Sequence, residues 1–200
     1  MKWFRKRNTS RQVEALFQAM EEKSLPKVRA LISATPTLVG KKDHQGISPF
    51  IYSVYMGEPS IVSYLIEKGA TPNEIAADGS SALTICMMEG RQELLQLLLE
   101  KGADPDLPDR YMATPLMYAA QRKLPQEASI LLAHGATPEL RDSEGDTILM
   151  YAVSSGSVEI VKLLLAYGAN PNSRNYDGLS ALDKSLDSEI SNLLQEALNQ

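Results

Sequence analysis

The sequence predicts an all-α fold built from stacked copies of one helix–turn–helix unit. Gly-Ala pairs begin at residues 69, 102, 135 and 168, each 33 residues after the previous pair. A Ser or Thr in front of an apolar segment recurs with the same period, at residues 48, 81, 114, 147 and 180. Apolar residues three or four positions apart follow in these copies, as on one face of a helix. A fixed period of this length is typical of repeat proteins, in which each copy buries its apolar face against its neighbours.

A short first helix is expected directly after each recurring Ser or Thr. A hydroxyl at this N-cap position accepts a hydrogen bond from a backbone N–H of the first helical turn. Pro49 and Pro115 come next in two copies, where the missing N–H of proline costs nothing. The small residues Ala119 and Ala120 permit close approach of a neighbouring helix. Glycines at residues 57, 90 and 156 then end the first helix.

The second helix of each copy is expected to end at the Gly of the Gly-Ala pair, because Gly suits the left-handed conformation of a helix C-terminus. Its apolar positions are Ile61, Val62, Leu65 and Ile66; Leu94, Leu95, Leu98 and Leu99; and Ile160, Val161, Leu164 and Leu165. The stretch from that Gly to the next helix is rich in Asp, Asn, Gly and Pro. This composition predicts an extended hairpin-like turn.

These residues resemble the ankyrin repeat, whose pattern reads Asp-x-x-Gly-x-Thr-Pro-Leu-His-x-Ala-Ala, then Gly, then Ile/Val-Val-x-x-Leu-Leu, then Gly-Ala. The resemblance covers roughly residues 11–198 and implies an ankyrin-repeat α-solenoid of about five to six repeats. Four full repeats are expected at 43–75, 76–108, 109–141 and 142–174. A divergent capping repeat is expected at 11–42, with its first helix at about 11–22, and a shortened helix pair at 175–200. Residues 1–10 are expected to form a basic tail.

Polar residues near both ends agree with capping repeats, because nothing stacks on the outward face of a terminal repeat. They are Glu14, Gln18, Glu21 and Lys23 at one end, and Asp187, Glu189, Asn192 and Gln195 at the other. We therefore expect a complete array.

Composition limits the chemistry open to the chain. An apolar fraction of 44% is ordinary for a folded protein and argues against disorder. The single cysteine, Cys86, excludes an internal disulfide and a cysteine-based zinc site, and it fits a cytoplasmic location. His44 and His134 are too isolated to indicate a metal site. No apolar run reaches the roughly 20 residues that span a bilayer. We expect neither a metal nor a cofactor.

Charge argues against nucleic acid as a partner. The net charge is −5, and five of the 20 basic residues lie within the first 11 positions. The rest of the chain therefore carries 15 basic and 25 acidic residues. Phosphate binding requires the opposite sign.

The sequence also predicts that the protein is not an enzyme. Catalysis of hydrolysis or group transfer needs a nucleophile beside a base, a metal set, or a loop that holds phosphate. Neither histidine shares a sequence unit with such a group, and no Gly-rich phosphate motif occurs. Repeat stacks also tend to lack a deep pocket that excludes water.

Partner-binding residues are expected on the concave face, because the resemblance implies that partners lie against the hairpin tips and the first helices. Tyr and Met bring a large contact area, and acidic groups can steer a basic partner. The candidates are Ile47, Tyr55, Met56, Met88, Tyr111, Met112, Arg122, Glu144, Asp146 and Asp177. For Met56 and Met88, packing between repeats is an equal alternative, and charged residues are the default on any solvated surface.

Departures from the family pattern add three expectations. The family pattern has a His near the start of the first helix, and this chain has other residues there, whose side chains we expect to pack in the core. They are Ile51, Thr84, Met117, Met150 and Asp183. Met112 and Lys123 replace glycines of the sister copies. A positive φ is costly for Met, so we expect the hairpin that contains Met112 to bend differently from the others and to expose Tyr111 and Met112. A partner contact would explain this irregular hairpin, and neutral drift is the alternative explanation. Cys86 stands at an Ala position and is expected to be a small buried filler.

The function predicted is that of a monomeric, non-catalytic protein–protein interaction module, an adaptor or an inhibitor. Two alternatives stay open. The acidic body favours an immunity-type neutraliser of a toxic enzyme. The first residues, with Trp3 and Phe4 among basic neighbours, would suit a membrane-tethered scaffold, although a frayed terminus is the simpler interpretation.

Overall fold

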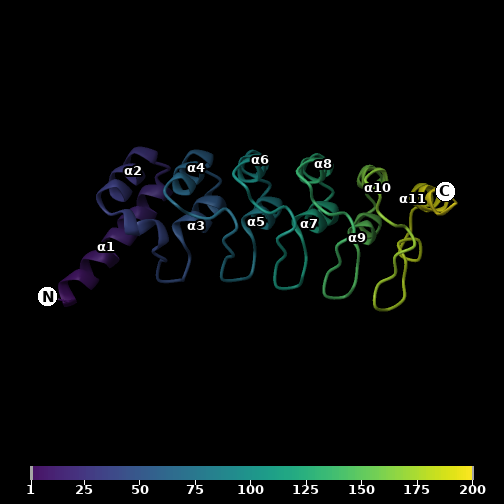
Figure 1. The fold of residues 1–200 in the computed structure, drawn as a ribbon, viewed down its shortest axis with the longest axis horizontal. Coiled ribbons are helices and arrows are strands. Elements are labelled where there is room, and N and C mark those ends of the chain that lie inside the picture. Colours follow the sequence, from purple (N-terminus) through teal and green to yellow (C-terminus); the bar gives the residue numbers. More distant parts are fainter. Residues whose placement is uncertain (1, 200) are drawn as a thin grey trace. The chain divides into compact units, whose positions relative to one another are not determined.

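The computed structural model describes the backbone of residues 2–199 and the side chains of residues 11–199. The chain forms two compact units, Met1–Ala103 and Asp104–Gln200 (Figure 1). The first contains α1 (Lys2–Glu21), α2 (Leu25–Ala34), the 3-10 helix η1 (Pro36–Gly40), α3 (Pro49–Met56), α4 (Pro59–Glu67), α5 (Ala82–Glu89) and α6 (Gln92–Glu100). The second contains α7 (Pro115–Gln121), α8 (Pro125–Ala133), α9 (Ile148–Ser155), α10 (Val158–Ala166) and α11 (Ser188–Leu198).

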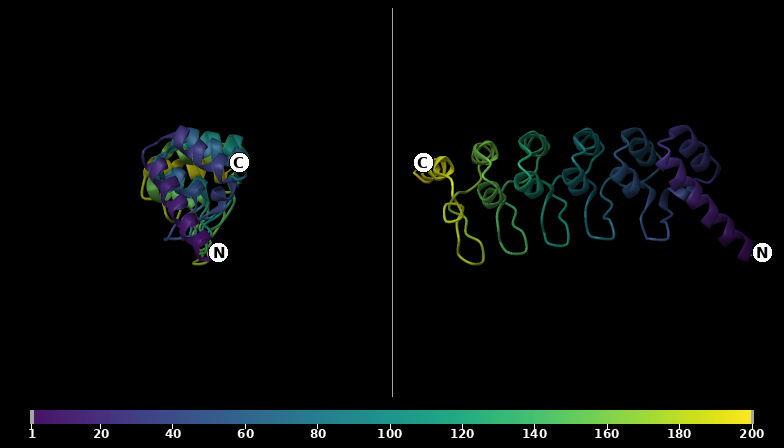
Figure 2. Two further views of the ribbon diagram at one scale, coloured as in Figure 1. Left: turned by 90° about the vertical axis from the view of Figure 1, so that its left-hand side faces the viewer. Right: turned by 180° about the vertical axis from the view of Figure 1, so that it is seen from behind.

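Within each unit the helices form two layers (Figure 1). The first helices of the repeats make one layer, α3 and α5 in the first unit and α7 and α9 in the second. The second helices make the other layer, α4 and α6 in the first unit and α8 and α10 in the second. Long loops extend beyond the first helices, as both views of Figure 2 show. The predicted all-α helical-repeat fold is confirmed.

The predicted N-caps are present in all four full repeats. The hydroxyl of Ser48 accepts a hydrogen bond from the backbone N–H of Ile51 at 3.1 Å, and Thr114 accepts from Met117 at 3.4 Å. Ser81 and Thr147 do the same in the other two repeats. Each such bond satisfies a backbone donor that the helix itself leaves without a partner, which contributes about 1 kcal/mol.

The residues at the family's His position lie in the core in four of five repeats. Ile51, Thr84, Met117 and Met150 are each no more than 2% exposed, which confirms core packing for these four. The expectation is wrong for Asp183, which is exposed and accepts hydrogen bonds from the backbone N–H and the hydroxyl of Ser180. A carboxylate is costly to bury without a paired charge, so it turns to the surface.

Five hairpin-like loops, which we call fingers, connect the repeats: residues 43–47 and 76–80 in the first unit, and 109–113, 142–146 and 175–179 in the second. In every finger the first residue's backbone N–H donates to the carbonyl of the fifth, for example Asp142 to Asp146 at 3.1 Å. Isolated antiparallel bridges close three fingers at their base, for example between Arg141 and Thr147. The hairpin-like turn predicted from the composition is confirmed.

Met112 does not bend its finger differently, and that expectation is wrong. Met112 takes a positive φ of 60°, where Gly145 of the next finger has 81°. Its backbone N–H donates to the carbonyl of Asp109 at 3.1 Å, just as Gly145 donates to Asp142. The hydrogen bonds of the turn thus outweigh the cost of a left-handed methionine, about 1–2 kcal/mol. The exposure of Tyr111 and Met112 is confirmed, at 62% and 53%.

The terminal elements differ from expectation in two ways. Helix α1 begins at Lys2, ahead of the predicted start near residue 11. The last repeat contains one α-helix, α11, in place of the expected pair, because residues 181–184 form turns. Asp187 already caps α11, which leaves too few residues for another helix and a connection. No helix in the described part of the chain is both long and apolar enough to cross a bilayer.

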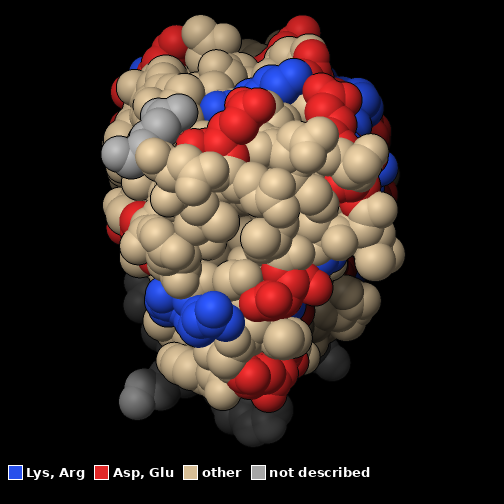
Figure 3. Space-filling view, turned by 90° about the vertical axis from the view of Figure 1, so that its right-hand side faces the viewer, with Lys and Arg blue, Asp and Glu red and all other residues tan. Residues whose placement is uncertain are grey.

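The outward faces of the terminal helices are polar, as predicted. Leu16 and Met20 of α1 are fully buried, while Glu14, Gln18 and Glu21 are exposed. At the other end, Asp187, Glu189, Asn192 and Gln195 are all exposed. Figure 3 faces the end where α11 lies and shows uncharged side chains over the middle, with acidic and basic ones around them.

Candidate partner-binding site

Two small pockets bring together four of the predicted partner-binding residues. In the first unit, Ile47 and Tyr55 line a pocket of about 200 Å³ between fingers 43–47 and 76–80. In the second unit, Tyr111 and Glu144 line a pocket of about 250 Å³ between fingers 109–113 and 142–146. The remaining candidates line neither pocket: Met56, Met88, Met112, Arg122, Asp146 and Asp177.

Tyr55 is tied to the neighbouring repeat, which limits its availability to a partner. Its hydroxyl donates to a carboxylate oxygen of Asp78 at 3.4 Å, and its carbonyl accepts from the guanidinium of Arg91 at 3.2 Å. Burial and the negative charge of Asp78 raise the pKa of Tyr55. The side chain of Arg91 lies so close to Gly57 that a Cβ there would be 2.8 Å from its Nε. These contacts indicate that Tyr55 stabilises the stack of repeats.

A wider groove in the first unit was not predicted. It has a volume of about 950 Å³ and lies between α1 and finger 43–47. Phe17 and Tyr52 form its aromatic floor, with ring centroids 4.9 Å apart. The Tyr52 hydroxyl donates to Glu21 at 3.0 Å, so the groove contains an acidic group, and Lys41 and Lys42 lie along its edge. The mixed charges give no single preference for the sign of a ligand.

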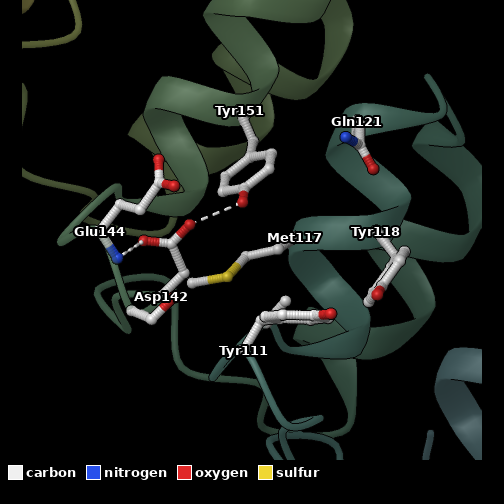
Figure 4. A pocket seen from close by; sticks show the side chains of 9 residues that line it. Tyr111, Met117, Tyr118, Gln121, Asp142, Glu144 and Tyr151 are labelled. Atoms are coloured by element: carbon white, nitrogen blue, oxygen red, sulfur yellow. Dashed lines mark hydrogen bonds between the residues drawn. The ribbon is translucent and has the colours of Figure 1, made fainter. Parts of the chain in front are cut away.

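The pocket of the second unit is built from two helices and two fingers (Figure 4). Helix α7 contributes the side chains of Met117, Tyr118 and Gln121, and α9 contributes Tyr151. The fingers contribute the other five lining residues, Tyr111, Ala113, Asp142, Ser143 and Glu144. In the figure, Tyr111 and Tyr151 lie on opposite sides of the opening and Met117 lies between them.

Two identical tyrosine–aspartate bonds position the aromatic rings. The Tyr118 hydroxyl donates to Asp109 at 2.7 Å, and the Tyr151 hydroxyl donates to Asp142 at 2.7 Å. The second carboxylate oxygen of each Asp accepts two backbone N–H groups of its own finger, for Asp142 those of Glu144 and Asp146. One carboxylate therefore fixes both the finger and the ring, and hydrogen bonds to a charged group are stronger than neutral ones.

The charged residues that line this pocket, Asp142 and Glu144, are both acidic. The pKa of Tyr151 is raised first by burial, then by its hydrogen bond to Asp142 and the charge of that residue, and also by the charges of Asp146 and Glu144. Asp146 itself pairs with Lys184 and accepts from the side-chain amide of Asn175 at 2.7 Å. The predicted acidic edge is thus partly neutralised at Asp146. Glu144 is exposed and takes part in none of the ion pairs found among the described residues.

Neighbouring fingers of the second unit are joined at their tips. The backbone N–H of Ser143 donates to the carbonyl of Tyr111 at 2.9 Å, and that of Tyr176 donates to the carbonyl of Glu144 at 3.2 Å. The Tyr176 ring also lies against Gly145, where a Cβ would approach it to 2.8 Å. These contacts hold the three fingers of this unit in a fixed register.

Sequence reasoning missed Tyr118, Tyr151 and Asp142 as site residues. A signal for them exists, since Tyr118 follows Asp109 by the same spacing by which Tyr151 follows Asp142. Repeats that lack this pairing, such as the one with Ala76 and Ile85, cannot make the bond. The basic N-terminal segment considered for membrane contact, residues 1–10, lies outside the residues whose side chains the structure describes.

A family model described as ankyrin repeats, in three copies, matches residues 16–109 and again residues 105–175. These matches cover most of the chain. No curated protein matches the sequence.

Proposed function

Because the chain belongs to the ankyrin-repeat family, we propose that it holds a partner protein against its finger tips and first helices, the surfaces that line the concave face in this family. Ankyrin repeats generally mediate protein–protein interaction, and proteins built from them are typically non-catalytic interaction modules. The proposed role is that of an adaptor or an inhibitor, in which binding itself is the activity.

The observation that carries this proposal is the tip of finger 109–113. Tyr111 and Met112 are large apolar side chains that are 62% and 53% exposed on a finger joined by hydrogen bonds to the next one. Tyr and Met are enriched in the cores of interfaces. An exposed aromatic anchor on a rigid support is the feature that dominates binding energy at many interfaces.

The test is capture of a partner by the full chain followed by crosslinking and mass spectrometry. We expect one stoichiometric partner whose crosslinks map to the fingers, with capture reduced at least about tenfold by Tyr111→Ala combined with Met112→Ala. The matched control is Tyr167→Ala, because Tyr167 is an exposed tyrosine of the same unit that follows α10 and lies on no finger. Recovery of no partner at low salt, or equal capture by the double variant, would count against the proposal.

An inhibitory role is favoured by one further observation, the net charge of −5 together with the acidic residues that line the pocket. Acidic surfaces accelerate association with basic proteins. If the chain neutralises an enzyme, the captured partner should lose its activity on addition of an equimolar amount of the chain. A partner that retains full activity in the complex would point to an adaptor.

A further inference from the structure

We propose that the pocket of the second unit, lined by Tyr111, Tyr118, Tyr151, Asp142 and Glu144, holds an arginine side chain of the partner protein. This inference rests on the proposed function and adds to it the chemical identity of the group that is recognised.

The walls of the pocket are aromatic. Tyr111, Tyr118 and Tyr151 surround the opening, and the thioether of Met117 lies behind it (Figure 4). A cation placed over the face of a tyrosine ring is attracted by the electron density of the ring, and a planar guanidinium also stacks on it. The exposed ring of Tyr111 is the wall to which a partner has direct access.

The charges of the pocket have one sign. Of the nine described residues that line it, none is Lys or Arg, whereas Asp142 and Glu144 are acidic. The Asp142 carboxylate is fixed by the Tyr151 hydroxyl and by two backbone N–H groups. The exposed Glu144 carboxylate lies at the rim, where it can meet a guanidinium with two parallel hydrogen bonds.

The hydrogen-bonding groups of the pocket favour a ligand that only donates. The Tyr151 hydroxyl donates its proton to Asp142 across 2.7 Å. What this hydroxyl can offer a ligand is therefore the lone pairs of its own oxygen, which accept hydrogen bonds. Both carboxylates are acceptors as well. Arginine carries five N–H donors in a flat fork and no acceptor, whereas lysine concentrates three donors on a compact, strongly hydrated head group. The flat, ring-lined shape therefore fits arginine better.

The corresponding pocket of the first unit has a different lining. Its apolar residues are Ile47, Ile51 and Ile75, and its charged residues have both signs, because Lys42 is present together with Glu74 and Asp78. Its hydroxyl donor Tyr55 bonds to Asp78, as Tyr151 bonds to Asp142, but Tyr55 is the one aromatic residue among the described residues of that lining, whereas three rings line the pocket of the second unit. The proposed recognition of arginine is therefore specific to the second unit.

The probe is a display library of random short peptides selected on the full-length chain, followed by affinity measurements on the synthesised peptides. We expect the recovered peptides to share an arginine. Its replacement by citrulline, which has nearly the same shape without the charge, should weaken binding at least about tenfold. Replacement by lysine should weaken it about threefold or more.

Variants of the protein locate the arginine. Glu144→Gln and Tyr111→Ala should each weaken binding about 5- to 10-fold. The matched controls are Glu159→Gln and Tyr167→Ala, which change the same residue types at exposed positions outside the pocket and should leave affinity unchanged. Circular dichroism of all four proteins should be identical, since all four side chains are exposed.

The outcomes separate the two proposals. Peptides that bind without arginine, or that bind Glu144→Gln and Tyr111→Ala as tightly as the unmodified chain, would overturn the arginine site and leave the interaction function intact. If lysine peptides bind as well as arginine peptides, the pocket recognises any cation, and the proposed selectivity for arginine is wrong. A library that yields no binder at all would remove support from both proposals.

Discussion

The two units of the molecule use the same helix pair, and their fingers differ in one place, finger 76–80 of the first unit. In the second unit each finger begins with Asp or Asn, namely Asp109, Asp142 and Asn175, whose side-chain oxygen accepts two backbone N–H groups of the finger. In the first unit, Asp43 accepts the N–H groups of Gln45 and Ile47 in the same way. Finger 76–80 instead begins with Ala76, which has no such oxygen, and Asp78 accepts the N–H of Ser80. One side-chain oxygen at the first position of a finger thus orders the whole tip, and it is present in all three fingers of the second unit but in one of the two fingers of the first.

The comparison extends to the cores. The first unit holds the single cysteine of the chain in α5, fully buried, and burial raises the pKa of the Cys86 thiol to about 12. Both units place partly buried tyrosines against carboxylates, Tyr52 and Tyr55 in the first and Tyr118 and Tyr151 in the second. In the second unit, where the candidate site lies, each acceptor is the Asp that begins a finger, so one residue joins the helix to the finger. Each of the following experiments tests one side of this contrast.

The largest effect is expected in the first unit, at Cys86. Because the thiol is buried and protonated, a thiol reagent at pH 8 should label the folded protein slower than the unfolded chain by several orders of magnitude. Above pH 9 the unfolded thiol ionises while the folded one stays protonated, so the free energy of unfolding should fall by about 1.4 kcal/mol per pH unit up to about pH 12. Denaturant titrations across this range measure the slope.

The control for this prediction is Cys86→Ala. It should remove the part of the fall in unfolding free energy above pH 9 that comes from the thiol, and leave the part that comes from tyrosines. Labelling of the native protein as fast as a free thiol would show that α5 opens readily and that the core of the first unit is not closed.

The second effect is expected in the second unit, at Asp142. Asp142→Ala removes the acceptor of the Tyr151 hydroxyl and of two backbone N–H groups, and should lower the free energy of unfolding by about 3 kcal/mol. Asp142→Asn keeps an acceptor for the finger and should cost roughly half as much. Thermal and urea unfolding of both variants provide the measurement. Equal stability of Asp142→Ala and the unmodified chain would contradict the role given to this carboxylate.

The smallest effect is expected from exchanging residues at the same position of two fingers. Met112→Gly in the second unit should stabilise the protein by about 0.5–1 kcal/mol, because glycine adopts the positive φ of 60° without strain. The reciprocal Gly46→Met in the first unit should destabilise by about 1 kcal/mol through φ alone, since a Cβ at Gly46 would meet nothing within 4 Å. A loss of stability in Met112→Gly would mean that the methionine side chain makes favourable contacts that outweigh the strain.

The fold could be predicted almost completely from the sequence, because its determinants are local and periodic. The hydroxyl of Ser48 or Thr114 acts on an N–H three residues away, and Gly57 ends a helix through its own φ of 71°. Such signals recur every 33 residues and support one another. The helices at the ends of the chain were predicted less accurately, because the period is lost there. Between residues 175 and 199 one α-helix forms where a pair was expected.

The candidate site could be predicted only in part, because several of its contacts join different repeats. Tyr111 and Glu144 were found from their places on the fingers, but the role of Asp146 in pairing with Lys184 depends on a residue 38 positions away. The conformation of Met112 was predicted wrongly because the cost of its positive φ was weighed without the hydrogen bonds of the turn. Side-chain pairing between repeats has no local pattern from which it can be read.

The hydrogen bonds between the finger tips of the second unit have a consequence for the speed and strength of association. A free loop must lose conformational entropy when a ligand settles on it, and this loss reduces affinity. Here the backbone of Ser143 is already joined to Tyr111, and that of Tyr176 to Glu144. A protein that bound these fingers as proposed would therefore meet a surface ordered during folding, and its docking would require no slow rearrangement.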